Sequence, residues 1–346
     1  MKGFLKQLSP FAPDNSGVVS ALFELGGLIA ICDAGGCTGN VCGFDEPRWF
    51  TMRSAVFSTG MRDMDAILGR DKLLVEKIVS AQHSVKAPFI VLVGTPVPAV
   101  IATDFKALRR MTEKQTGVPV LTVESTGVNY YDKGASKAYE MLFDTFAGEK
   151  LPVDQESVGV IGATPLDFSS CCAGRYIGEA VKGKAHVYGM GSGLEEIKRA
   201  SANKINLVVS PSGIAAAKLL EKRFGTPWQI DVPYFPEELL VALPALEGKR
   251  VLVIHQQFAA SALRKKLIAC RAADVAVGTF FMSEKSLFMA QDRIFKEEDD
   301  PAAVAKEFNA DVVIADRHFK KVLRDFKGTF IDFPHFAVSG RLWEAK

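Results

Sequence analysis

The sequence predicts an α/β protein made of three Rossmann-like domains, each a doubly wound parallel sheet. Short apolar, β-rich runs alternate with amphipathic helical segments along the chain, which is typical of parallel strands joined by crossover helices. Two polar connectors, residues 147–156 and 244–249, divide this alternation into three stretches of about one hundred residues or slightly more. A chain of 346 residues with 48% hydrophobic content can bury cores of this size.

Each expected strand is a short apolar run bounded by turn residues. In chain order these runs are residues 28–31, 89–93, 118–123, 158–161, 187–189, 205–209, 229–232, 250–254, 275–279, 312–315 and 330–333. The main helical segments, in which apolar residues recur at three and four, are 71–85, 133–146, 194–202, 214–224 and 302–308. The predicted domains are therefore residues 1–150, 151–247 and 248–346.

Charge and hydropathy patterning argue against two kinds of partner. The 42 basic and 40 acidic residues leave a formal charge of +2, which gives no long-range field to attract nucleic acid or an anionic membrane. No apolar run reaches the ~18 residues that span a bilayer, and the first twenty residues lack the pattern of a secretory signal. We therefore expect a cytoplasmic protein with no nucleic-acid or membrane partner.

A glycine-rich loop after the first strand holds three of the six cysteines, Cys32, Cys37 and Cys42. Structural zinc sites usually combine two closely spaced cysteine pairs, whereas this loop supplies no fourth ligand of its own. Thiolates in such a loop suit an iron–sulfur cluster completed from elsewhere, for instance from another subunit. The alternative is that these thiols are small buried hydrophobic side chains, as free cysteines often are.

Other candidate binding residues follow predicted strands, where parallel sheets bind ligands. Thr95, Glu124 and Ser125 lie in turns of the first domain, and His255 directly follows the strand at 250–254. If these turns converge on one crevice, the four residues would contact a cofactor. Ordinary turn chemistry and a structural histidine are the alternatives. The glycine-rich segment 189–193 lacks the spacing of a dinucleotide fingerprint, and no Walker phosphate loop occurs.

The chain resembles the nitrogenase component 1 family, which includes reductases of protochlorophyllide and nickel-sirohydrochlorin. Residues 33–37 resemble the family's His-Gly-Pro-x-Gly-Cys turn. Further collinear matches are 57–60, 67–73, 95–104, 116–127, 193–197, 204–208, 224–228, 249–253 and 310–314. The resemblance covers nearly the whole chain, and the family also has three Rossmann-like domains.

The resemblance implies a homodimer, or a heterodimer with a related subunit, that holds a [4Fe-4S] cluster at the subunit interface. Electrons would come from an ATP-dependent reductase like the nitrogenase iron protein, and a small-molecule substrate would bind among the three domains. Cys37 falls on a family cluster ligand. The family's two other first-domain cysteines correspond to positions near Asp14 and Pro96, so Asp14, Cys32 and Cys42 are the candidate replacement ligands.

Two further departures concern the family's catalytic cofactor. Its cysteine ligand corresponds to a position near Ser210 and its histidine ligand to a position near Trp343, so neither ligand is present. We therefore expect no dinitrogen reduction. The predicted function is a nitrogenase-like oxidoreductase subunit that passes low-potential electrons through the cluster to an unidentified small molecule or tetrapyrrole, with no catalytic residue assigned. The alternatives are a non-catalytic scaffold or carrier for a metal cluster or cofactor, and a binding fold whose cysteines are merely packed.

Overall fold

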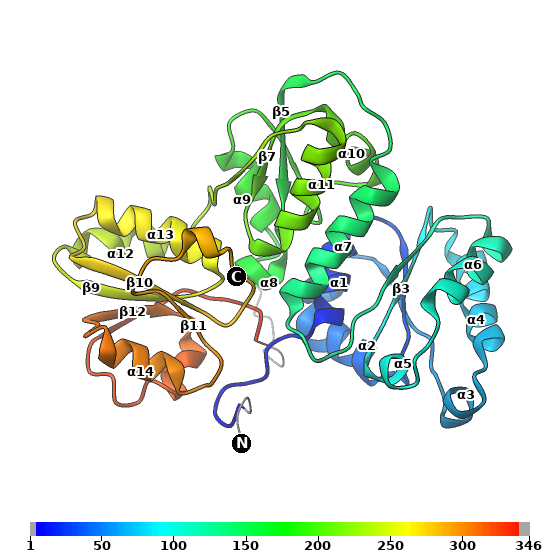
Figure 1. Ribbon diagram of the computed structural model, residues 1–346, viewed down its shortest axis with the longest axis horizontal. Helices are drawn as coiled ribbons and strands as arrows, with labels where there is room; N and C mark the ends of the chain where they lie inside the picture. Colours follow the sequence, from blue (N-terminus) through cyan, green and yellow to red (C-terminus); the bar gives the residue numbers. More distant parts are fainter. Residues whose placement is uncertain (1–4, 339–346) are drawn as a thin grey trace.

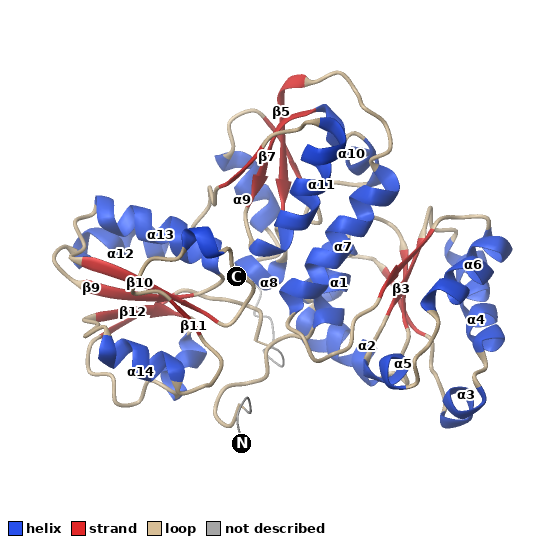
Figure 2. Cartoon of the chain, in the orientation of Figure 1, coloured by secondary structure: helices blue, strands red, loops and turns tan. Residues whose placement is uncertain are grey.

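Three parallel sheets, one after another along the chain, form the core of the protein. The computed structural model describes residues 5–338. Figure 1 shows the three sheets as separate layered units that meet near the middle of the molecule, and Figure 2 shows helices packed around each of them. The α/β class with parallel sheets, predicted from periodicity, is confirmed.

The first sheet has the strand order β2-β1-β3-β4, and every neighbouring pair is parallel. Its strands are β1 (Leu28–Ile31), β2 (Ala55–Ser58), β3 (Ile90–Val93) and β4 (Val120–Val123). The helices of this region are α2 (Gly36–Asn40), α3 (Asp63–Leu68), α4 (Asp71–Val85), α5 (Pro96–Val100) and α6 (Phe105–Thr116). All residues of β1 and β3 are buried, as expected for strands covered on both faces.

The second sheet repeats this topology in the order β6-β5-β7-β8. Its strands are β5 (Asp154–Ile161), β6 (Lys184–Val187), β7 (Asn203–Val208) and β8 (Trp228–Ile230). Its helices are α8 (Pro165–Phe168), α9 (Ala173–Ala180), α10 (Leu194–Lys198) and α11 (Ile214–Phe224).

The third sheet has five parallel strands in the order β11-β10-β9-β12-β13. They are β9 (Arg250–Ile254), β10 (Asp274–Thr279), β11 (Arg293–Ile294), β12 (Val312–Ala315) and β13 (Thr329–Asp332). The surrounding helices are α12 (Glu237–Ala242), α13 (Gln257–Ala269), α14 (Asp300–Glu307) and the 3-10 helix η7 (Arg317–Lys321). In Figure 1, α12 and α13 cover one face of this sheet and α14 lies on the other.

Most predicted elements are present, with informative differences at the edges of the sheets. The helices predicted at 71–85 and 214–224 have those bounds, whereas β2 and the two-residue β11 were not predicted. The strand predicted at 187–189 lies at Lys184–Val187, because Gly189 has a φ of +90° that extended backbone does not adopt. Each sheet falls inside one predicted domain range, but the boundaries after residues 150 and 247 stay predictions. No helix within residues 5–338 is long and apolar enough to cross a membrane.

Strand order fixes where ligands can approach each sheet. In a doubly wound sheet the crevice opens beyond the carboxyl ends of the two strands at which the winding reverses. These strands are β1 and β3 in the first sheet, β5 and β7 in the second, and β9 and β12 in the third. The loops after these six strands are therefore the positions at which a site is expected.

A glycine-mediated helix contact joins the first two sheets. Helices α1 (Asp14–Leu22) and α7 (Tyr131–Phe146) pack side by side between them (Figure 1). A Cβ atom added to Gly17 would lie 1.8 Å from the carbonyl oxygen of Tyr131, and one added to Gly134 would lie 1.8 Å from that of Asp14. Only glycine permits this approach of two backbones.

We predict that Gly134→Ala lowers the free energy of unfolding by at least about 2 kcal/mol, because its methyl group would overlap a carbonyl oxygen that belongs to α1. The matched control is Gly178→Ala on α9, where a Cβ atom meets nothing within 4 Å. It should change stability little or add about 0.5–1 kcal/mol through helix propensity. Urea unfolding of both variants tests this, and equal effects would contradict the close contact.

Candidate metal centre

The cysteine loop leaves the first sheet at its switch point. Cys32 directly follows β1, and its backbone N–H donates to the carbonyl oxygen of Val93 at the end of β3. The Thr95 hydroxyl, in the loop after β3, donates to the carbonyl oxygen of Cys32 at 2.7 Å. The loops of β1 and β3 are thus fastened together where the topology predicts a ligand crevice.

Asp33 shapes the turn that presents Cys37. Gly35 has a φ of +117°, which allows the chain to reverse into the short helix α2. The buried Asp33 carboxylate accepts hydrogen bonds from the Thr38 N–H at 2.8 Å and the Ser58 hydroxyl at 2.6 Å. This carboxylate therefore fixes α2, which carries Cys37, against the neighbouring strand β2.

Cys37 and Cys42 are both half-buried and pack against the same hydrophobic core. Cys37 lies on α2, and Cys42 lies on the π-helical turn Val41–Asp45 that continues it. π-Helical turns are rare and are frequently found at functional sites. The structure brings these two predicted ligands onto one short helical segment.

Cys32 lies on the opposite face of the first sheet. Side chains alternate along a strand, so Leu28, Ala30 and Cys32 face the core under α4 and α6, whereas Ile29 and Ile31 face the core that receives Cys37 and Cys42. Cys32 is fully buried. As a ligand it would have to leave this core, and its role in metal binding stays a prediction.

Asp14 stabilises a turn of the first domain. From the start of α1, its carboxylate accepts hydrogen bonds from the backbone N–H groups of Gly127 at 2.7 Å and Thr126 at 3.0 Å. It also accepts from the Asn129 side chain at 3.3 Å. Its predicted role as a ligand is likewise untested. Within residues 5–338, no group of three or more histidine, cysteine, aspartate or glutamate residues is arranged to hold a metal ion.

The predicted cofactor-binding residues Thr95, Glu124 and Ser125 lie in the loops after β3 and β4. Thr95 is fully buried against Cys32, and the Ser125 hydroxyl donates to the Gly94 carbonyl at 2.6 Å. Glu124 has an exposed side chain, and its carbonyl oxygen accepts a hydrogen bond from Lys137. Thr95 and Ser125 thus hydrogen-bond to backbone, and the role of all three residues in cofactor binding stays a prediction.

Burial and negative charge keep the loop thiols protonated. Burial raises the pKa of Cys32 to about 12, with a further contribution from the Asp33 carboxylate. Burial also raises the pKa of Cys42 to about 11, assisted by the charges of Glu46 and Asp33. For Cys37, burial and Asp33 raise the pKa, while a hydrogen bond with Thr95 lowers it in part. Since thiolates are the nucleophiles and metal ligands, these thiols are poor nucleophiles, and metal binding would displace their protons.

A buried ion-pair network around Arg48 holds the segment that follows Cys42. No pattern in the sequence indicated this network. Arg48 is completely buried and donates to both carboxylate oxygens of Glu46 at 2.7 Å and to Glu24 at 2.8 Å. It also donates to the carbonyl oxygens of Ser20 and Gly189 at 2.6 and 2.7 Å. Although burial alone would lower the pKa of Arg48, the two carboxylates raise it above its usual value. Arg48 is therefore charged, and it ties the cysteine segment to the second domain.

The glycine-rich segment 189–193 is the second domain's side of this contact. Besides the Gly189 carbonyl, which accepts from Arg48, the Gly191 N–H donates to the Glu24 carboxylate at 2.6 Å. A Cβ atom at Gly189 would lie 2.8 Å from the Tyr139 hydroxyl oxygen. Gly189 and Gly191 therefore join the loop after β6 to Arg48 and Glu24.

His255 lies away from the cysteine loop, at the switch point of the third sheet. It stacks between Phe333 and His335, each with a ring-centroid distance of 4.1 Å. Burial lowers its pKa to about 4, so the imidazole is neutral at physiological pH. Its Nε2 atom lies 3.3 Å from the carbonyl oxygen of Pro334, whereas its Nδ1 atom has no hydrogen-bond partner.

A packed polar and aromatic cluster fills the junction around His255. The Tyr131 hydroxyl donates to Asp167 at 2.8 Å and lies 3.1 Å from Nε2 of His335, so the start of α7 meets residues of the second and third sheets' loops. The Phe281 ring contacts both Tyr131 and His335. Ser210, the position of a missing family ligand, instead bonds to the Gly162 carbonyl. Trp343 lies outside the described residues.

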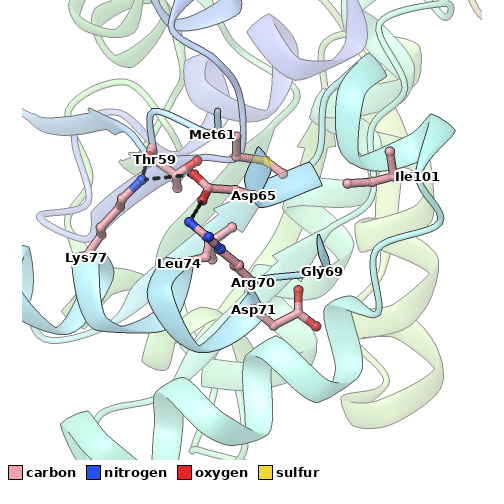
Figure 3. A pocket seen from close by; sticks show the side chains of 9 residues that line it. All are labelled: Thr59, Met61, Asp65, Gly69, Arg70, Asp71, Leu74, Lys77 and Ile101. Carbon is pink, nitrogen blue, oxygen red and sulfur yellow. Dashed lines mark hydrogen bonds and ion pairs between the residues drawn. The ribbon is translucent and has the colours of Figure 1, made fainter. Parts of the chain in front are cut away.

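A small pocket lies on the α4 side of the first sheet, opposite the face that receives Cys37 and Cys42. Figure 3 shows Lys77 and Arg70 directed toward Asp65, with Thr59 and Met61 close by. Lys77 donates to the Thr59 carbonyl at 2.9 Å, and Arg70 lies 3.5 Å from the Asp65 carboxylate. The pocket has a volume of about 20 Å³, enough for roughly one water molecule.

Comparison with known proteins identifies the class of protein that this fold and cysteine turn define. Residues 36–239 match the family described as nitrogenase component 1 type oxidoreductase. The chain belongs to this family.

Two cofactor biosynthesis proteins and one solved structure are similar to this chain. It is 26% identical over 204 residues to the nitrogenase iron-molybdenum cofactor biosynthesis protein NifE of Klebsiella pneumoniae, a match that covers 51% of this chain and 42% of that protein. It is 28% identical over 182 residues to NifE of Methanococcus maripaludis, covering 49% and 36% of the two chains. The chain thus matches less than half the length of these curated relatives.

A solved structure, nitrogenase Cp1 at pH 6.5, superposes with a TM-score of 0.72 over 96% of this chain and 87% of that chain, at 14% identity.

We predict that Arg48→Met lowers the free energy of unfolding by about 3–5 kcal/mol, because it leaves the Glu46 and Glu24 carboxylates unpaired beside the buried position. Arg109→Ala is the control, since Arg109 forms only an exposed pair with Glu113 on α6. Its loss should cost less than about 0.5 kcal/mol. Chemical unfolding followed by circular dichroism measures both, and a small effect at Arg48 would refute the buried network.

A pH-dependent prediction concerns Asp167. Burial raises its pKa to about 7, while hydrogen bonds from Thr164 and Tyr131 oppose the shift. The folded state therefore holds a proton that the unfolded state releases, so this contribution to stability is complete below about pH 4 and is lost as the pH rises through about 7. Across that interval, Asp167 should make the wild-type free energy of unfolding fall by up to about 1.4 kcal/mol per pH unit. We expect the Asp167→Asn variant to lack this fall.

Urea unfolding at several pH values measures that slope. The exposed Asp325→Asn variant is the control and should keep the wild-type pH dependence. Parallel stability curves for Asp167→Asn and wild type would contradict a raised pKa at Asp167.

Proposed function

We propose that this protein is a metal-cluster carrier or scaffold in cofactor assembly, which holds an iron–sulfur cluster between two subunits through Cys37 and Cys42. One observation carries the proposal: two half-buried thiols share a single short helical segment at the switch point of the first sheet. Cys37 is also the residue of this chain that matches a cluster ligand in the family turn.

The donor atoms suit such a cluster. Thiolates are the usual ligands of iron–sulfur clusters, and neither Cys37 nor Cys42 is committed to a disulfide. Two thiols are too few for a four-iron cluster, so a partner subunit would complete the ligand set. When bound, the cluster would supply one-electron transfer. A [4Fe-4S] type is our expectation from the resemblance.

An exposed apolar surface next to Cys42 supports a subunit contact there. The segment after Cys42 carries large apolar side chains that remain accessible to solvent, among them Phe50, which is 63% exposed. The others are Phe44, Trp49, Met52 and Phe57. Contiguous exposed apolar residues mark interaction sites on proteins. Pairing of two such surfaces would bury them and bring Cys37 and Cys42 toward the partner.

The residues around the thiols hold and tune the site. Asp33 fixes α2 through Thr38 and Ser58, and Asp45 fixes the π-helical turn by accepting from Asn40 at 2.6 Å. Arg48 neutralises part of the carboxylate charge beside Cys42. The charge of Asp33 would disfavour the addition of an electron to a nearby cluster, which lowers the reduction potential.

Two observations favour assembly over catalysis. The two NifE relatives are iron-molybdenum cofactor biosynthesis proteins. The junction of the three sheets is occupied by packed side chains of Tyr131, His255, Phe281 and His335, so the predicted position for a substrate is filled. The second candidate, a reductase subunit that receives electrons from an ATP-dependent iron-protein-like partner, is favoured by the oxidoreductase family itself.

We predict that anaerobic reconstitution with iron and sulfide gives wild-type protein a brown colour and bound iron. Cys37→Ser and Cys42→Ser should each lose most of the bound iron, because each removes a thiolate ligand. Visible absorption, electron paramagnetic resonance and iron analysis measure the loss. Cys270→Ser is the control, since Cys270 is a half-buried cysteine at the end of α13, outside the loop, and should not affect iron. A Cys37→Ser variant that retains wild-type iron would overturn the proposed site.

The two candidate functions differ in what happens to the cluster. A carrier should transfer iron to an apo acceptor protein without consuming reductant. A reductase subunit should keep its iron and oxidise the reduced partner catalytically. Following the iron content of both proteins and the oxidation of the reductant in one reaction separates them.

A further inference from the structure

The third domain carries a basic surface that the proposed function does not use. It consists of five exposed residues on η7 and the crossover to β13, namely Arg317, Lys320, Lys321, Arg324 and Lys327. Residues 316–327 contain these five cations and two carboxylates, one of which, Asp316, is buried. The net charge of this segment exceeds the formal +2 of the whole chain, so positive charge is concentrated here.

These five side chains form no ion pair with any part of the chain between residues 5 and 338. Exposed arginines and lysines elsewhere do, as Arg293 pairs with Glu307 and Arg223 with Asp144. Two of the five are held by other contacts: Lys320 lies over the Phe330 ring at 4.8 Å, and Arg324 donates to the Lys321 carbonyl. Lys320 and Arg324 are therefore held in place, and the Arg317 backbone N–H donates to the Asp332 carboxylate.

A groove lies beside this surface, between α14 and residues 322–328. Its volume is about 640 Å³, and apolar side chains form much of its lining, including Ala302, Ala305, Val322 and Phe326. Lys306 and Lys327 contribute positive charge at the same groove, and Asp325 contributes one carboxylate. We name it the α14 groove. Because Ala310 and Gly328 precede β12 and β13, it lies at the amino ends of these strands, opposite the carboxyl ends where His255 is found.

We propose that the α14 groove and the basic surface together dock an acidic segment of a partner protein, with an apolar side chain of that segment inserted in the groove. An apolar groove beside a surface on which positive charge outnumbers negative charge is an arrangement by which protein interfaces combine affinity with selection of an oppositely charged partner. The cations extend from Arg317 to Lys327, beyond the lining of the groove, which favours a polypeptide over a small anion. The apolar lining favours protein over nucleic acid.

The test uses the full chain and fluorescein-labelled synthetic peptides. The probe is a short amphipathic peptide with leucine and phenylalanine on one face and glutamate on the other. One matched peptide replaces glutamate by lysine, and another replaces the apolar residues by serine. A single-stranded DNA oligonucleotide of similar charge is the fourth probe. Fluorescence anisotropy at low and high salt gives each affinity.

Two variants address the surface and the groove separately. Lys320→Glu combined with Lys321→Glu reverses charge on the basic surface, and Ala303→Glu places a carboxylate at the exposed edge of the α14 groove. Each should weaken binding of the glutamate peptide by roughly tenfold or more. Lys218→Glu combined with Lys222→Glu, on exposed positions of α11, is the charge-matched control and should bind as wild type. Thermal unfolding verifies that each variant is folded.

The outcomes are decisive in both directions. Salt-sensitive binding of the glutamate peptide alone, lost in both variants and kept in the control, supports the proposal. No binding of that peptide, equal binding of the lysine or serine peptide, or equal loss in the control overturns it. Equal binding of the DNA also overturns it, because the surface would then bind any polyanion.

Discussion

A completely buried arginine determines how the cysteine-bearing segment is held. Arg48 joins Glu46, in its own segment, to Glu24, which follows α1, and to the Gly189 carbonyl of the second domain. A buried guanidinium persists only where carboxylates and carbonyl oxygens satisfy it. Arg48 therefore fixes its partners relative to one another. Because Glu46 directly follows the π-helical turn, the turn that carries Cys42 is held in place as well. The glycine contact between α1 and α7 supports the same arrangement from the other side.

The three sheets share one topological rule and use it for different purposes. At the first switch point the loops present two half-buried thiols beside an exposed apolar segment. At the third, His255 is sealed between Phe333 and His335. The thiols at the first switch point are thus partly accessible, whereas His255 at the third is covered by stacked rings. In this chain the chemistry of the proposed site belongs to the first sheet, and the other two sheets supply its support.

Periodicity in the sequence was sufficient to predict the class of fold, because strands buried on both faces and amphipathic helices have distinct patterns. It could place Cys37 and Cys42 in one loop. It could not show that Cys32 lies on the opposite face from them, since this depends on the side of the sheet to which the loop after β1 carries Cys37 and Cys42. Arg48 carries no local signal at all: its partners Glu24 and Gly189 are distant in sequence and meet only through tertiary packing. The packing of Tyr131 against Asp167 and His335 could not be predicted either, because these residues are also distant in sequence.

We propose that Cys37 and Cys42, together with sulfur atoms of a second subunit, hold one iron–sulfur cluster. Native mass spectrometry of protein purified and kept under anaerobic conditions measures both the number of subunits and the bound cluster. We expect a dimer whose mass exceeds that of its chains by the iron and sulfide of one cluster, and monomers that appear only together with loss of that mass. A dimer or monomer with the mass of polypeptide alone would contradict it.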